Sequence, residues 1–140
     1  MDKETRSEIW ECCNTIEECY EFMLAYAAKG FQSEDKSGSK SEIREFLEGA
    51  VIAINGLAEN CAMTVREEAL APSEKYQAFL TVLDRDARDS LAAIELVLAQ
   101  PSISSQLIDN LNASIHLRAL LTDLFLIGDV FRSQLVKGDR

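Results

Sequence analysis

The fold is decided by residues 73–100, SEKYQAFLTVLDRDARDSLAAIELVLAQ, which lie between the only two prolines of the chain. The apolar residues of this stretch recur at steps of three and four, which places them on one face of an α-helix: Tyr76, Leu80, Leu83, Ala87, Leu91, Ile94 and Leu98. The charges of residues 84–89 alternate in sign, which is typical of a solvent-exposed helix face. Because proline is tolerated in a first helical turn but not inside a helix, Pro72 and Pro101 should bound this helix.

The same periodicity predicts three further helices, over residues 3–29, 39–71 and 102–136. Residues 30–40, GFQSEDKSGSK, are polar and rich in serine and glycine, so we expect a flexible linker between the first two helices. Weak helix formers around Asn112 predict a break in the last helix, and Pro72 predicts a break before the third. The predicted fold is all-α, an antiparallel four-helix bundle that forms a single domain over residues 1–140.

The charge balance restricts the partners. The 140 residues include 14 Lys and Arg against 24 Asp and Glu, giving a formal net charge of −10. Nucleic acids and anionic membrane surfaces are therefore not expected as partners, whereas a protein with a basic surface would suit this charge. The start, Met1-Asp2-Lys3-Glu4, carries no apolar signal region, and no run of residues is apolar enough to span a bilayer. We expect a cytoplasmic protein with free thiols.

The second half of the last predicted helix is apolar on most of its circumference. A surface helix needs only one apolar stripe, so the surplus predicts burial against a second copy of the chain. The expected interface of this homodimer comprises Leu117, Leu120, Leu124, Ile127, Val130 and Phe131. Coverage of this helix by its own chain is the competing interpretation.

A second stripe, on the predicted helix over residues 39–71, consists of small residues: Gly49, Ala53, Gly56 and Asn60. Glycine inside a helix destabilises it by about 1 kcal/mol relative to alanine, so a close neighbour is expected there. A tightly packed helix is the simpler interpretation. The alternative is a small-ligand pocket beside Gly49, Ala53 and Gly56.

The cysteines suggest another kind of site. An antiparallel pairing of the first two helices would bring Cys61 level with Cys12 or Cys13, and such a group could bind a soft metal or act as a redox pair. Buried cysteine, however, commonly serves as a small core residue. His116 is the only histidine and has no glutamate three residues before it, which excludes the two Glu-x-x-His motifs of a di-iron bundle. We therefore expect no metal and no cofactor.

The sequence contains no recognisable catalytic set or phosphate-binding loop. We expect a non-enzymatic protein-interaction module: a homodimeric helical-bundle adaptor, regulator or assembly factor. The alternatives are a thiol-based metal-binding or redox module using Cys12, Cys13 and Cys61, and a small-ligand binding bundle.

Overall fold

The structure is a computed structural model that describes residues 3–35 and 41–138, and every regular element in these ranges is an α-helix. The six helices are α1 (Lys3–Ala28), α2 (Glu42–Ile54), α3 (Leu57–Glu67), α4 (Ser73–Leu98), α5 (Ser105–Ala113) and α6 (His116–Gly138). The all-α prediction is confirmed for the described residues, whereas the predicted count of four helices is not matched. None of these helices combines the length and the apolar character that crossing a membrane requires.

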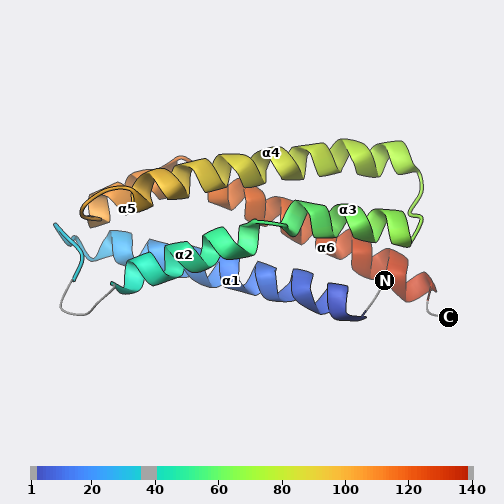
Figure 1. Ribbon diagram of the computed structural model, residues 1–140, viewed down its shortest axis with the longest axis horizontal. Coiled ribbons are helices and arrows are strands. Elements are labelled where there is room, and N and C mark those ends of the chain that lie inside the picture. Colours follow the sequence, from blue (N-terminus) through green and yellow to red (C-terminus); the bar gives the residue numbers. More distant parts are fainter. Residues whose placement is uncertain (1–2, 36–40, 139–140) are drawn as a thin grey trace.

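The helices lie along the long axis of an elongated molecule (Figure 1). The two longest helices, α1 and α4, each pack against α2, α3, α5 and α6, and they do not pack against each other. Helices α2 and α3 follow one another end to end along one side of the molecule. Helices α5 and α6 together run back from the end of α4 to the end of the molecule at which α1 begins. Each of these two pairs of helices therefore occupies the place of one helix that the sequence predicts.

The core lies where the apolar stripes of the helices meet. In α1 the buried residues are Ile16, Cys19, Met23 and Tyr26, and in α4 they are Leu80, Leu83, Ala87, Ser90, Ile94 and Val97. Complete burial of one leucine or isoleucine side chain contributes about 1.5–3 kcal/mol, so these stripes provide the main stabilisation of the fold. The face of α4 is rotated slightly from the predicted one, because Ser90 and Val97 are buried where the sequence suggested Leu91 and Leu98.

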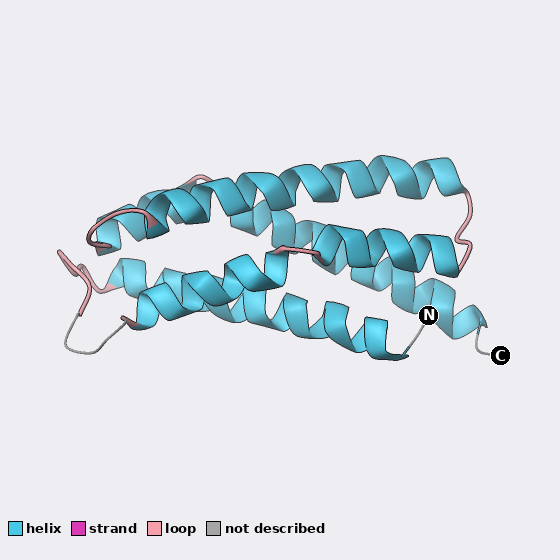
Figure 2. Cartoon of the chain, viewed as in Figure 1, coloured by secondary structure: helices cyan, strands magenta, loops and turns pink. Residues whose placement is uncertain are grey.

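Two helix breaks interrupt the long segments (Figure 2). Gly56 has a φ of +86°, and its carbonyl accepts a hydrogen bond from the N–H of Asn60 at 2.9 Å, so it ends α2 and starts α3. The sequence interpretation placed Gly56 inside one continuous helix and was wrong at this point. Ile115, with a φ of +63°, separates α5 from α6 next to the break expected at Asn112. The expected break at Pro72 is also present, since α4 begins at Ser73.

The segment between α1 and α2 is only partly described. Residues 36–40 of the predicted linker lie outside the described residues, while residues 30–35 are described. Glu34 is 5% exposed and is held by Ser41, Arg44 and the backbone of Ile103. This part of the linker is therefore fixed to the helices around it, because a buried carboxylate requires such partners.

Candidate functional site

Helix α6 is the element on which the predicted interface lies, and the structure places most of that interface in the core. Five of the six residues are at most 5% exposed within the single chain, namely Leu117, Leu120, Leu124, Ile127 and Phe131, while Val130 is half-buried. The reason is that α6 packs against both α1 and α4, so two of its sides are covered by its own chain. The five buried residues are not on a surface that a second copy could reach in this structure.

The part of α6 that α1 and α4 leave uncovered still carries large apolar residues. Phe125 is 50% exposed and Leu126 is 54% exposed. Arg118 and Asp129 lie on the same side, seven residues before and four residues after Phe125, and both are exposed. We call Arg118, Thr122, Phe125, Leu126 and Asp129 the outer face of α6. It combines an apolar centre with one positive and one negative end.

A cavity of about 150 Å³ lies beside the outer face, between α1 and α6. Its walls are mainly apolar and include Ile9, Trp10, Leu124, Phe125, Gly128 and Phe131. Asn14, Glu17 and Arg132 add polar groups to the lining. A more open groove of about 330 Å³ lies on the other side of α6, where Tyr76 and Phe79 of α4 face Leu126 and Val130. Both hollows reach Ile127, so an apolar surface extends across α6 in both directions.

Two acidic side chains meet between α4 and α6. Asp86 of α4 is in hydrogen-bonding contact with Asp123 of α6, and burial together with this contact raises the pKa of Asp123 to about 7. The Oδ2 atom of Asp123 is buried and has no hydrogen-bond partner among the described residues. Two carboxylates in hydrogen-bonding contact repel each other unless they share a proton, so the pair retains a proton in mildly acidic solution.

The small-residue stripe lines neither the cavity nor the groove beside α6. Gly49 faces α1, where an added Cβ would lie 3.9 Å from Thr15 Cγ2, an ordinary contact distance. An added Cβ at Gly56 would meet nothing within 4 Å, so this glycine is required by its positive φ and not by close packing. Ala53 is buried in the core, and Asn60 is half-buried after the helix break. The cavity and the groove beside α6 both lie away from these four residues.

Cys12 and Cys13 of α1 lie close enough to Cys61 of α3 to influence its ionisation. Burial and the charges of Cys13 and Cys12 raise the pKa of Cys61 to about 12. Burial, with Cys12 and Glu17, raises that of Cys13 to about 11. Thiols with such high pKa values are protonated at neutral pH, whereas metal ligation and thiol exchange use the thiolate. No group of three or more His, Cys, Asp or Glu side chains within the described ranges is placed to hold a metal ion.

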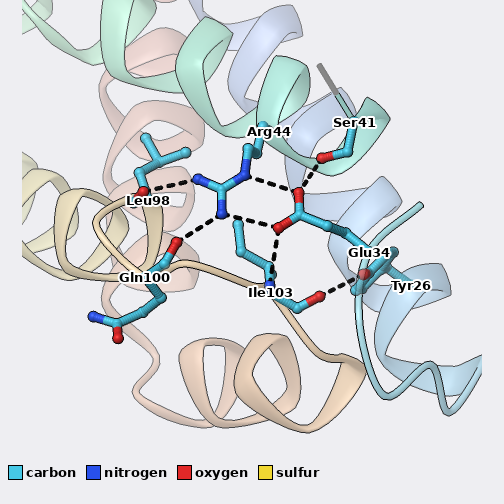
Figure 3. Close-up of polar contacts among 7 residues, drawn as sticks. All are labelled: Tyr26, Glu34, Ser41, Arg44, Leu98, Gln100 and Ile103. Atoms are coloured by element: carbon cyan, nitrogen blue, oxygen red, sulfur yellow. Dashed lines mark hydrogen bonds and ion pairs between the residues drawn. The ribbon is translucent and has the colours of Figure 1, made fainter. Parts of the chain in front are cut away.

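The most extensive polar cluster lies at the end of the molecule where α1 and α4 finish and α2 and α5 begin (Figure 3). Arg44 of α2 donates from Nε and from one terminal nitrogen to the two carboxylate oxygens of Glu34, at 2.8 and 2.9 Å. It also donates to the carbonyls of Leu98 at 2.8 Å and Gln100 at 2.7 Å. The guanidinium therefore connects the linker to the segment that follows α4.

Glu34 completes this cluster from the other side. Its carboxylate accepts hydrogen bonds from the Ser41 hydroxyl and from the Ile103 N–H, the latter at 3.0 Å. Burial acts to raise the pKa of Glu34, but the hydrogen bonds from Arg44 and Ser41, the Arg44 charge and the Ile103 N–H outweigh it and lower this pKa. Tyr26 of α1 joins the cluster by donating to the Ile103 carbonyl at 2.7 Å. We call Tyr26, Glu34, Ser41 and Arg44, with the backbone of Leu98, Gln100 and Ile103, the latch.

The sequence interpretation missed both the latch and the acidic pair. Glu34 stands in a polar, serine-rich stretch, where one acidic residue looks like any other solvated charge. Asp123 is a polar residue within an apolar run, and the sequence pattern assigns it no role. One observation pointed in the right direction: Asp123 lies between Leu120, Leu124 and Ile127 on the helix, and a charge among core positions requires a partner.

Comparison of the chain with known proteins gave no match to a protein-family model, to a curated protein or to a solved structure.

Proposed function

We propose that the protein is a non-enzymatic interaction module of the cytoplasm that forms a homodimer through the outer face of α6. Its architecture is interpreted as an antiparallel four-helix bundle in which two of the four rods are each made of two helices. The observation that supports this proposal is the exposure of Phe125 and Leu126, side by side, between charges of opposite sign. A contiguous apolar patch on a surface is typical of association sites, and Phe125 and Leu126 are continuous with the apolar linings on both sides of α6.

The charges on the outer face suit a twofold arrangement. Arg118 and Asp129 are eleven residues apart, which is close to three helical turns, so both point to the same side of α6. In a twofold dimer the two copies of α6 would run antiparallel, with the axis passing near residues 123 and 124. Arg118 of each copy would then face Asp129 of the other, and Phe125 would lie between these two ion pairs.

The present partner of Asp129 does not prevent this exchange. Arg132 donates a hydrogen bond to the Asp129 carboxylate within α6, and both side chains are largely exposed. Exposed ion pairs of this kind contribute about 0–1 kcal/mol, so replacing one by a pair that is partly shielded from water requires little energy. Arg132 would remain at the edge of the interface.

Three alternatives have weaker support. The raised pKa values of Cys13 and Cys61 disfavour a thiol-based metal or redox module, because the reactive thiolate is scarce at neutral pH. A different protein with a basic surface would match the net charge of −10, but it would not use the positive end of the outer face. A small-ligand function beside Gly49, Ala53 and Gly56 gains no support from the two hollows at α6, since none of these residues lines them.

The oligomeric state tests the proposal directly. We expect multi-angle light scattering to show a concentration-dependent dimer for the wild type and a monomer for Phe125→Asp. The control Ile52→Asp changes an apolar residue that is even more exposed, at 75%, and that lies on α2, which does not pack against α6; it should leave the dimer intact. A wild type that remains monomeric over the whole accessible concentration range would disprove the proposal.

A charge exchange tests the arrangement of the two copies. Arg118→Asp or Asp129→Arg alone should weaken the dimer, since like charges would then face each other. The double variant Arg118→Asp/Asp129→Arg should restore it, because each ion pair re-forms with its ends exchanged. A double variant weaker than both single variants would show that these residues do not face each other across a twofold axis.

A further inference from the structure

The cavity between α1 and α6 has the properties of a small-molecule site. It lies where the first half of α1 passes the second half of α6, and its volume is about 150 Å³. Apolar cavities of this size in other proteins take up molecules as large as a benzene ring. The walls here are provided by the side chains of Ile9, Trp10, Leu124, Phe125 and Phe131.

Gly128 is the reason that this space is not filled. It lies inside α6 and lines the cavity, and a Cβ added to it would meet no atom within 4 Å. A glycine inside a helix destabilises the helix by about 1 kcal/mol relative to alanine, and neither a turn nor a positive φ requires one here. The missing side chain leaves the cavity open beside Trp10, whose side chain is 59% exposed.

The polar part of the lining restricts the kind of molecule. Glu17 and Arg132 contribute opposite charges, and Asn14 contributes an amide with both a donor and an acceptor. A strongly charged ligand would be repelled by one of the two charges, whereas a neutral group that donates and accepts hydrogen bonds suits all three. We propose that this cavity binds a small neutral molecule with an apolar body of six-membered-ring size and one hydroxyl group.

The only tryptophan of the chain lines this cavity, so binding can be followed by intrinsic fluorescence. Cyclohexanol is the probe, since it has the required body and hydroxyl and does not absorb where tryptophan does. We expect a saturable shift of the Trp10 emission to shorter wavelength and a rise in melting temperature, because a ligand that binds the native state stabilises it. Inositol, with the same ring and a hydroxyl on every carbon, should have neither effect.

Two substitutions at the same position separate the cavity from the exposed surface of Trp10. Gly128→Leu fills the space and should abolish both responses to cyclohexanol. Gly128→Ala strengthens the helix in the same way but leaves most of the cavity, so it should still bind. A wild type without a saturable response would overturn the proposal, and so would a Gly128→Leu variant that responds like the wild type.

The site does not depend on the proposed dimer, although Phe125 contributes to both. The titration is performed at a protein concentration where light scattering shows a monomer, so a failure to dimerise leaves the expected binding unchanged. Loss of cyclohexanol binding with an intact dimer would reject the cavity proposal alone.

Discussion

Gly49 and Gly56 belong to the same small-residue stripe, yet the backbone uses them differently. Gly49 has helical geometry and ordinary space around its missing Cβ, whereas Gly56 has a φ of +86° at the start of α3. A residue with a side chain in the left-handed region is strained by about 1–2 kcal/mol. The requirement for glycine is therefore local to the break between α2 and α3.

The first prediction compares alanine at these two positions. Gly56→Ala should lower the free energy of unfolding by about 1–2 kcal/mol, because alanine is strained at this φ. Gly49→Ala should raise it by up to about 1 kcal/mol, since alanine favours the helix and the nearest atom leaves room. Urea unfolding followed by circular dichroism measures both. Equal effects of the two substitutions would contradict the assignment of the break.

Single residues were the hardest feature to predict from the sequence. Glycine in an apolar stripe indicates that something is special at that position, but not whether the cause is a close neighbour or a positive φ. The positive φ of Ile115 could not be predicted from the residue type, because a β-branched residue is rarely found at a φ of +63°. Such positions are imposed by the way the neighbouring helices pack, and this information lies elsewhere in the chain.

At the scale of elements, α6 shows why amphipathicity alone did not distinguish core from interface. Apolar residues do occupy most of the circumference of α6, but α6 packs against both α1 and α4, which together cover more than one apolar stripe. The number of helices that surround an element depends on the whole topology and not on the sequence of that element. What could be predicted was that α6 carries surplus apolar surface, and the exposed Phe125 and Leu126 remain as that surplus.

The second prediction concerns the acidic pair between α4 and α6. The pKa of Asp123 is raised to about 7 from 3.8, so the folded protein binds more protons than the unfolded chain between these pH values. Stability contributed by this group is therefore present at low pH and decreases as the pH rises from about 4 to about 7. Asp123→Asn removes this dependence. It should raise the melting temperature at pH 8, and the gain should diminish towards pH 5.

A charge-matched control accompanies this measurement. Asp109→Asn changes the net charge by the same amount at an exposed position of α5, and it should leave the pH profile of the wild type unchanged. If Asp109→Asn reproduced the gain at pH 8, the effect would come from the overall negative charge and not from the pair.

At the scale of the whole molecule, the all-α character of the described residues could be predicted from the sequence, whereas the count of four helices could not, because two of the predicted segments are each divided into two helices. The apolar periodicity of residues 73–100 and the two prolines beside them were sufficient for α4. The latch was not predictable, because four of its hydrogen bonds join residues 54–77 positions apart, and each of these four uses a backbone carbonyl or N–H group. Backbone carbonyl and N–H groups have the same chemistry at nearly every residue, so no sequence pattern indicates which of them will bind a distant side chain.

The third prediction is the contribution of the latch to stability. Arg44→Ala leaves the Glu34 carboxylate buried without its cation, and breaking such a buried pair lowers the free energy of unfolding by about 3–5 kcal/mol. Arg88→Ala removes the exposed pair with Asp84 and should lower it by less than about 1 kcal/mol. Chemical unfolding of the two variants at pH 7 measures the difference. Similar losses of unfolding free energy for both variants would mean that the latch stabilises the protein no more than an exposed ion pair does.

The distances that the latch spans along the chain also determine when it can form during folding. Arg44 reaches the carbonyls of Leu98 and Gln100, 54 and 56 residues away, and these carbonyls arrive only after α4 has folded back along the molecule. Contacts of this kind follow the local helices and their nearest pairings, since long loops must close first. The latch should accordingly slow unfolding without affecting folding. Arg44→Ala would increase the unfolding rate and leave the refolding rate almost unchanged.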